Sequence, residues 1–262
     1  MGSKLTESTA GDVPEQDATR ADIGLVCALP LELAEFFSRC SKVKTYTGGK
    51  FTFRGGLFSD TIRVAMVESG TGIVRARRAT EALLDAHSPR WVVSTGFCGA
   101  LVSGMQVGHI VVANKITMNA QDELTVDVGM KSDAERGLHV GRTLTIDHMV
   151  RTIVEKQALA EQSGAIAVDM ETHAIASVCL DRKNRFMAVR SVSDDLTADL
   201  PVEVLSLVGE TGAVRFGAVV GALWKRPSSY KDMWRLREHA MIASEKLATF
   251  LEGVVRQLHA SP

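Results

Sequence analysis

The feature that most constrains the fold of this chain is a series of apolar runs of strand length, separated by helical patterns. The runs "IGLVCAL" (23–29), "RWVVST" (90–95) and "AIAVD" (165–169) are continuous, which is typical of strands buried on both faces. The longest helical pattern, over 233–258, carries a single apolar stripe. Such an alternation of buried strands and helices predicts an α/β sandwich around a central mixed sheet.

The distribution of polar residues predicts one domain behind a short arm. Residues 1–21 are polar and lack periodicity, so they are predicted to form a disordered N-terminal arm. No linker and no internal repeat divides residues 22–262, and 45% of the chain is hydrophobic, which is sufficient for a full core. We therefore expect a single domain over 22–262.

Charge and motif content exclude several classes of partner. The formal net charge is −1 without a basic stripe, which argues against binding to nucleic acid. No apolar run approaches the roughly 18 residues needed to span a membrane. The four cysteines have no CxxC spacing, which indicates free thiols in a reducing compartment and no metal site. Dinucleotide and P-loop motifs are absent, so we expect a cytoplasmic protein without a cofactor.

Three carboxylates come directly after predicted strands, at Glu32, Glu171 and Asp194. In α/β sheets, ligands bind beyond the carboxyl ends of the strands. Each acid taken alone is better explained structurally, Glu32 and Glu171 as acids at a helix N-terminus and Asp194 as an N-cap or turn residue. A fourth strand runs into "GFCGAL" (96–101), which is predicted to be a turn of small residues that lets the backbone approach a ligand. Together these features predict one binding site.

Five segments carry a resemblance to a known family: "ALPLEL", "SGTGIVRA", "STGFCGALVSGMQVGHIVV", "AIAVDMETHAIASVC" and "AVRSVSDD". In this order they resemble the signature segments of the nucleoside phosphorylase and nucleosidase superfamily, over residues 23–200. The most similar functional branch is that of the methylthioadenosine/S-adenosylhomocysteine nucleosidases. The resemblance implies a single-domain α/β/α sandwich around a central mixed, barrel-like sheet.

The resemblance also implies roles for the three acids. Glu32 would orient and deprotonate the attacking water, Asp194 would be the acid at purine N7, and Glu171 would accept hydrogen bonds from the ribose hydroxyls. Cleavage of an N-glycosidic bond passes through an oxocarbenium-like sugar, and carboxylates suit these tasks. The other predicted substrate-binding residues are Met170, Ser193, Arg190, Met149, Val150, Gly96, Phe97 and Cys98.

Two positions favour water over phosphate as the nucleophile. Phosphorolytic relatives carry an arginine where this chain has Glu32, and a glutamate there repels phosphate. Many relatives carry a serine where this chain has Phe97, which removes another phosphate contact. The sequence therefore predicts a purine nucleosidase that hydrolyses a 5′-substituted adenosine.

Other readings stay open at this point. Met149 stands where adenine-cleaving relatives stack a phenylalanine on the purine, and "VDMETHAIA", "ADLP" and "LWKRPSSYKDMWRLREHA" resemble a branch associated with hopanoid synthesis. That branch implies adenosylhopane, which carries a large apolar 5′ group, as an alternative substrate. A catalytically inactive nucleoside-binding module is a third reading. Relatives are usually dimers, so we expect a homodimer.

Overall fold

The computed structural model describes residues 20–119, 121–202, 204 and 229–261. Residues 1–19, most of the predicted arm, lie outside this range, so the arm stays a prediction. In the described part of the chain, ten strands join into one mixed sheet. They are β1 (Ile23–Cys27), β2 (Cys40–Gly48), β3 (Phe51–Phe58), β4 (Ile62–Glu68), β5 (Trp91–Ala100), β6 (Ile110–Thr117), β7 (Glu123–Thr125), β8 (Leu138–Thr145), β9 (Ala167–Asp169) and β10 (Arg185–Asp194).

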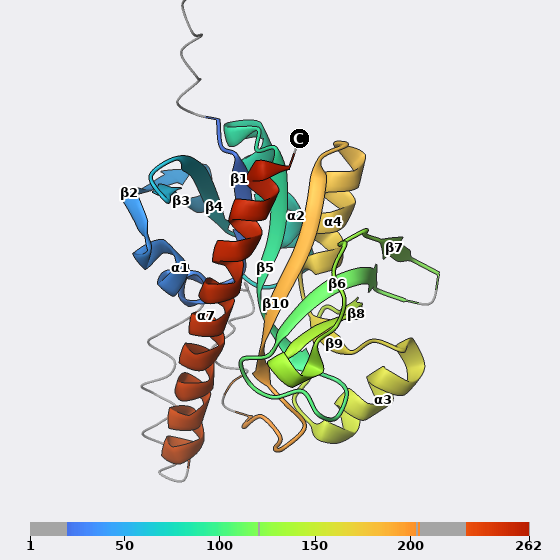
Figure 1. Ribbon diagram of the computed structural model, residues 1–262. Helices are drawn as coiled ribbons and strands as arrows, with labels where there is room; N and C mark the ends of the chain where they lie inside the picture. The colour runs from blue at the N-terminus through green and yellow to red at the C-terminus, as the bar shows by residue number, and fades with distance from the viewer. Residues whose placement is uncertain (1–19, 120, 203, 205–228, 262) are drawn as a thin grey trace, which may run out of the picture.

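Part of this sheet closes on itself, as the predicted barrel-like sheet requires. Strand β5 pairs with both β9 and β10, β10 pairs with β6, and β8 pairs with β6 and β9. These pairings form a closed ring of strands. Strands β1, β4, β3 and β2 extend from β5 as an open wing. The ring and the wing therefore share β5 (Figure 1).

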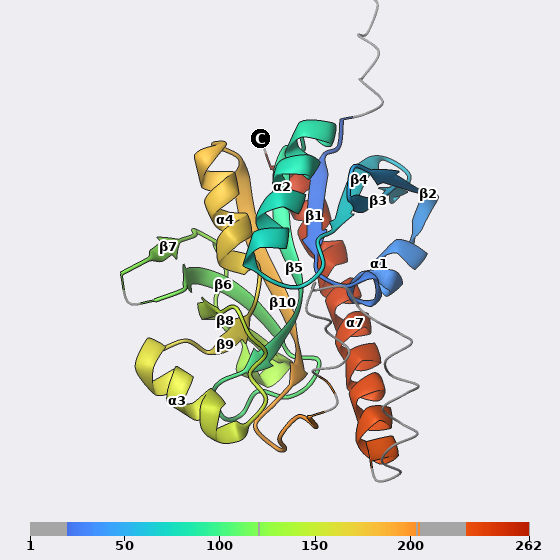
Figure 2. The ribbon, with the colours of Figure 1, turned by 180° about the vertical axis from the view of Figure 1, so that it is seen from behind.

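Helices cover both faces of the sheet, which confirms the sandwich. They are α1 (Ala34–Ser38), α2 (Ile73–His87), α3 (Ile153–Ser163), α4 (Thr172–Asp181) and α7 (Ser229–Ala260), with 3₁₀ turns η1 (Pro30–Glu32) and η2 (Ala134–Arg136). Helix α7 crosses one face with α1 beside it, and α2 and α4 lie together on the other (Figures 1 and 2). No helix in the described part of the chain has the length and apolarity that a membrane crossing requires.

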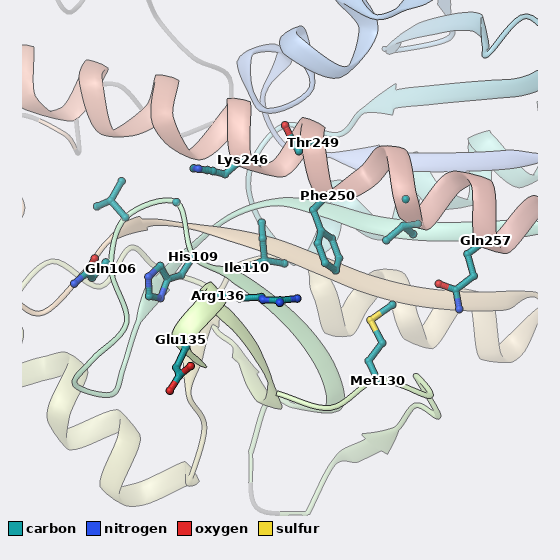
Figure 3. Close-up of a pocket in the computed structure, with 15 residues that line it drawn as sticks. Gln106, His109, Ile110, Met130, Glu135, Arg136, Lys246, Thr249, Phe250 and Gln257 are labelled. Carbon is teal, nitrogen blue, oxygen red and sulfur yellow. The ribbon is translucent and has the colours of Figure 1, made fainter. Parts of the chain in front are cut away.

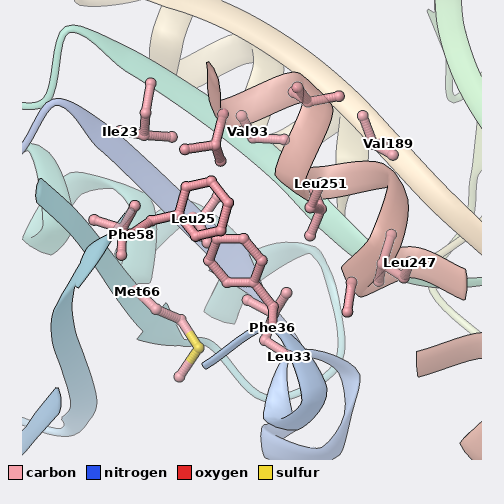
Figure 4. Close-up of a cluster of buried hydrophobic side chains, with 14 of the residues drawn as sticks. Ile23, Leu25, Leu33, Phe36, Phe58, Met66, Val93, Val189, Leu247 and Leu251 are labelled. Atoms are coloured by element: carbon pink, nitrogen blue, oxygen red, sulfur yellow. The ribbon is translucent and has the colours of Figure 1, made fainter. Parts of the chain in front are cut away.

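The side chains of β1 alternate between the two faces of the sheet, so this strand requires a covering layer of helices on each face. Ile23 and Leu25 point to the α7 side, where they are buried with Leu247 and Leu251 (Figure 4). Val26 points the other way, into the cluster formed with α2 and α4. A strand with apolar residues on both faces is stable only between two covering layers. The continuous apolar run therefore predicted its position correctly.

Two local predictions were wrong. The predicted turn at 96–101 is extended: β5 continues through Ala100, because its residues pair with β10 as far as the Gly99–Asp194 pairing. The helical spacing of Leu33, Phe36, Phe37 and Cys40 after Pro30 predicts one helix over 30–40. That helix is instead broken into η1 and the short α1, because the side chain of Glu32 turns back to the preceding backbone. Both departures bring backbone N–H groups and carboxylates to the same end of the sheet.

Candidate active site

Glu32 is held at the end of β1 by backbone donors from two strands. Its Oε2 accepts hydrogen bonds from the N–H groups of Ala28 and Leu29, each at 2.8 Å, and its Oε1 accepts one from Phe97 on β5 at 2.9 Å. The side chain is almost fully buried. Burial raises the pKa of Glu32, and the nearby Arg190 and these backbone donors offset part of that rise. The sequence therefore placed this carboxylate correctly at a strand end.

Arg190 lies on β10 at the centre of the polar groups and is 1% exposed. Its Nη2 donates to Thr172 Oγ1 at 2.8 Å and to Ser94 Oγ at 3.0 Å. Its Nε lies 3.5 Å from Asp169 Oδ2, and its Nη1 lies 3.8 Å from Glu171 Oε2. The guanidinium is therefore fixed by hydroxyls and carboxylates of the protein itself.

The two carboxylates after β9 have different surroundings. Asp169 Oδ1 accepts hydrogen bonds from the N–H groups of Glu171 and Thr172 and from Thr145 Oγ1, at 2.9–3.0 Å. Asp169 thus satisfies backbone donors at the start of α4. Glu171 accepts one backbone hydrogen bond, from Gly72 at 2.8 Å, and burial raises its pKa to about 7. The hydrogen bonds of Asp169 therefore explain its burial by a structural role. Glu171 can still accept further hydrogen bonds, from a ligand.

Gly96 permits the close approach of Glu32 and Arg190. Its φ of 143° lies in a region that favours glycine, and a Cβ there would lie 2.6 Å from Glu32 Oε1 and 2.8 Å from Arg190 Nη1. Any larger residue would separate the two groups. We call Arg190 together with Glu32, Asp169 and Glu171 the Arg190 cluster.

Asp194 lies at the end of β10 in a different setting. Its Oδ2 lies 2.5 Å from Lys156 Nζ, and its Oδ1 accepts a hydrogen bond from Ser193 Oγ at 2.7 Å. The side chain of Asp194 is 15% exposed, whereas that of Lys156 is fully buried. A Cβ at Gly99 would lie 2.9 Å from Asp194 Oδ2, so β5 also makes room for this carboxylate.

Lys156, which α3 contributes to this site, was not among the residues predicted from the sequence. The signal was available in part: on a helix, Lys156 shares a face with Leu159 and Ala160, which pack on the core at the end of β8 and β9. By contrast, Val154 on the same helix is 76% exposed. A lysine on the buried face of an amphipathic helix requires a partner, and that partner is Asp194.

The other residues predicted to bind the substrate differ in how deeply they are buried. Cys98 is buried beside Ser193, whose hydroxyl donates to its carbonyl oxygen at 3.4 Å. Phe97 and Met170 are half-buried at the ends of β5 and β9. Val150 is buried with Leu144 and Val168, and Met149 before it is half-buried. Contact of Met149, Val150 and Met170 with a ligand stays a prediction.

A cavity of about 730 Å³ lies away from these acids, between α7, the start of β6 and η2 (Figure 3). Its wall combines the apolar Met130 and Phe250 with Arg136, Lys246 and Gln257. None of the predicted site residues is among the described residues that line it. The polar constellation at the strand ends, rather than this cavity, therefore defines the candidate active site.

The sequence matches the family described as the Phosphorylase superfamily over residues 22–131 and 126–224. Among curated proteins, it is similar to the 5′-methylthioadenosine/S-adenosylhomocysteine nucleosidase of Shewanella loihica, at 24% identity over 216 residues, 72% of this chain and 93% of that one. The nucleosidase of the same name from Maridesulfovibrio salexigens is 25% identical over 202 residues, 68% of this chain and 87% of that one.

Solved structures share the fold. A Helicobacter pylori mutant of the methylthioadenosine nucleosidase, with 5′-methylthioadenosine in its active site, superposes with a TM-score of 0.69 at 16% identity, over 90% of this chain and 99% of that one. The futalosine hydrolase of the same organism gives a TM-score of 0.68 at 16% identity, over 90% and 98% of the two chains. At these identities, the likeness establishes the fold alone.

Proposed function

Because the chain belongs to the phosphorylase superfamily, we propose that it is a nucleosidase that hydrolyses the N-glycosidic bond of a 5′-substituted adenosine and releases adenine. The observation that carries this proposal is the convergence of Glu32, Glu171 and Asp194 at one end of the sheet. The similarity to nucleosidases that act on methylthioadenosine and S-adenosylhomocysteine supports the same substrate class.

The surroundings of Glu32 favour water as the nucleophile. A phosphorylase holds the phosphate dianion with arginine side chains and free backbone N–H groups. Here the N–H of Phe97 is occupied by Glu32, and the guanidinium of Arg190 is held by Thr172 and Ser94. An acid whose pKa is raised by burial is also well suited to accept a proton from a water molecule.

The other two acids divide the remaining chemistry. Glu171 has an oxygen, Oε2, that lies beyond hydrogen-bond distance from Arg190, so it can accept a hydrogen bond from a ribose hydroxyl. Its charge also favours the positive charge that develops on the sugar in the transition state. Asp194, which is partly exposed and supported by Ser193, protonates N7 so that adenine leaves as a neutral base.

The 5′ substituent defines the substrate within this class, and we propose that long apolar groups such as a hopanoid tail are accepted. Met149 is half-buried next to Val150, and an unbranched thioether adapts to different shapes. The value of kcat/KM for adenosines with increasing apolar 5′ chains should therefore stay level or rise relative to methylthioadenosine. A steep fall with chain length would restrict the substrate to small 5′ groups.

One incubation tests the reaction type. Methylthioadenosine is given to the enzyme with and without phosphate, and adenine, free reducing sugar and sugar 1-phosphate are quantified. We expect equal adenine release in both buffers, with free sugar as the second product. Strict phosphate dependence would identify a phosphorylase, and binding of methylthioadenosine without adenine release would identify an inactive nucleoside-binding module.

A further inference from the structure

Lys156 is the only described lysine among the largest fully buried side chains of the protein. A lysine almost never has zero exposure unless a negative charge compensates it. Its position on α3 places it behind Asp194: the ammonium is inaccessible, while the carboxylate keeps 15% exposure. The ammonium of Lys156 therefore lies in the interior, and the carboxylate of Asp194 lies between it and the surface of the candidate active site.

The hydrogen bonds of Lys156 use all three donors of the ammonium. Nζ lies 2.5 Å from Asp194 Oδ2, 3.0 Å from the carbonyl oxygen of Asp195 and 3.3 Å from the carbonyl oxygen of Asp194. Two neutral carbonyls and one carboxylate stabilise a charged ammonium and point it at a single acceptor. The contact between Nζ and Oδ2 is short enough for direct proton transfer.

This geometry presents a chemical difficulty for the role of Asp194. A carboxylate that faces an ammonium carries a negative charge, and it has no proton to give to purine N7. A leaving adenine nevertheless needs a proton. The proton of the pair resides on Lys156, one short hydrogen bond away from the carboxylate.

We propose that Lys156 and Asp194 act as one proton-donating unit, in which Lys156 stores the proton and Asp194 passes it to the leaving base. The inference rests on the proposed function and names the source of its proton. Lys156 is a positioning and proton-supplying residue that acts through Asp194, since its side chain has no exposed surface while that of Asp194 is 15% exposed.

The protons balance over one turnover. As the bond between C1′ and N9 breaks, its electron pair goes to the purine, Asp194 delivers a proton to N7, and one N–H proton of Lys156 moves to Asp194. Water adds to C1′ and loses its proton to Glu32. After the products leave, Glu32 releases that proton to solvent and the Lys156–Asp194 pair takes one up, so no other reactant is needed.

The other titratable and charged groups around Lys156 and Asp194 do not take part in this proton transfer. On β5, burial raises the pKa of the Cys98 thiol far above its ordinary value, so Cys98 stays neutral. The carboxylate of Asp195 accepts hydrogen bonds from Thr197, and that of Glu155 on α3 accepts from Arg151. The charges of Asp169 and Arg190, which also act on Cys98, belong to the Arg190 cluster and are paired there.

The test compares two leaving groups in the full-length enzyme and in Lys156→Met, with pH as the variable. The substrates are methylthioadenosine and the p-nitrophenyl glycoside of the same methylthio sugar, whose leaving group departs as an anion and needs no acid. Without Lys156, the carboxyl of Asp194 has to take its proton from solvent, whereas in the wild-type enzyme Lys156 supplies it. Lys156→Met should therefore lose about 10²-fold or more in kcat on methylthioadenosine at neutral pH. That loss should grow as the pH rises and protons in solvent become scarcer.

Two further variants separate proton supply from charge and from packing. Lys156→Arg keeps a positive charge that is not released as a proton, so it should stay slow on methylthioadenosine. Lys115→Met removes an exposed lysine that pairs with Glu123, and it should keep the wild-type pH profile. Both Lys156 variants should retain most of the activity on the p-nitrophenyl substrate, which also reports that the site is folded.

The outcomes are distinct from those of the proposed function. If the wild-type enzyme releases adenine without phosphate but Lys156→Met keeps the wild-type pH profile, the inference is overturned and the nucleosidase stands. Equal losses on both substrates, or full rescue by Lys156→Arg, would also overturn it, because Lys156 would then serve packing or charge alone. A wild-type enzyme that releases no adenine overturns the proposed function and this inference together.

Discussion

Strand β10 contributes Arg190 to the Arg190 cluster and Asp194 to the Lys156–Asp194 pair, yet the two groups balance charge in opposite ways. In the cluster, the carboxylates of Glu32, Asp169 and Glu171 surround the single guanidinium of Arg190. In the pair, one ammonium faces one carboxylate. One end of the site therefore carries surplus negative charge, and the other is neutral.

The difference teaches how a single strand can serve two steps of one reaction. Surplus buried negative charge is costly in the empty protein, which is why burial raises the pKa of both Glu32 and Glu171. That cost is offset when a positive charge develops on a bound sugar. The neutral pair attracts no cation and instead retains a proton for the base that leaves.

The largest effect is expected from a substitution of Asp194, the exposed member of the Lys156–Asp194 pair. Asn has nearly the shape of Asp but cannot transfer a proton, so Asp194→Asn should lower kcat for adenine release by roughly 10²- to 10⁴-fold. The same variant should lose far less on the p-nitrophenyl glycoside. Equal losses on both substrates, with chemistry rate-limiting, would show that Asp194 is not the acid.

The next effect breaks the cluster at its centre. Arg190→Met removes the one cation that compensates the buried carboxylates, and loss of one partner from a buried pair costs about 3–5 kcal/mol of the free energy of unfolding. Urea denaturation measures this loss. Arg182→Met, which removes a side chain 51% exposed and paired with Asp85, is the control and should change stability by less than about 0.5 kcal/mol. Similar values for the two variants would contradict the central role of Arg190.

A third change removes the negative charge of one carboxylate in the Arg190 cluster while it keeps the volume of the side chain. Glu32→Gln keeps the shape of the side chain but cannot accept the proton of water, so kcat should fall by roughly 10²-fold. The dissociation constant for a non-hydrolysed nucleoside, measured by calorimetry, should stay near the wild-type value. A loss confined to binding would assign Glu32 to substrate positioning instead of base catalysis.

The smallest effect is a slope in stability against pH that Glu171 of the cluster produces. The pKa of Glu171 is about 7 in the folded protein against an ordinary 4.5, so between these values the folded state binds more protons than the unfolded state. Its contribution to stability is therefore present at low pH and is lost as pH rises toward 7, at up to about 1.4 kcal/mol per pH unit. Glu171→Gln should flatten this slope in denaturation experiments between pH 5 and 7.

The sequence predicted those parts of the site that depend on strand ends. Glu32 and Asp194 follow β1 and β10, which run parallel to β5, so their position at one edge of the sheet follows from local patterns. Glu171 follows β9, which is antiparallel to β5, so only the closure of the ring brings it to the same site. Lys156 could not be placed in the same way, since its partner lies on a distant strand and only the packing of α3 brings them together. The break at Leu33, between η1 and α1, was missed for a similar reason: the hydrogen bond that the N–H of Phe97 donates to Glu32 comes from another strand.

The fold prediction failed at β5 for a reason that also matters to the site. Small residues at 96–101 indicated a turn, because glycine is frequent in turns. The structure uses Gly96 and Gly99 within a strand, where each leaves room for a carboxylate on a neighbouring element. Composition identified the need for space but could not identify the backbone conformation that provides it.

The shared strand β5 has a consequence for how such an enzyme can diverge. Gly96 accommodates Glu32 and Gly99 accommodates Asp194, and the Cα atoms of these two glycines are three residues of extended chain apart, about 10 Å. Covalent geometry fixes that length independently of the surrounding helices and loops. Under the proposed function, mutations around Met149 would change which 5′ group is accepted without moving these two glycines. Specificity and chemistry would then evolve on separate parts of the chain.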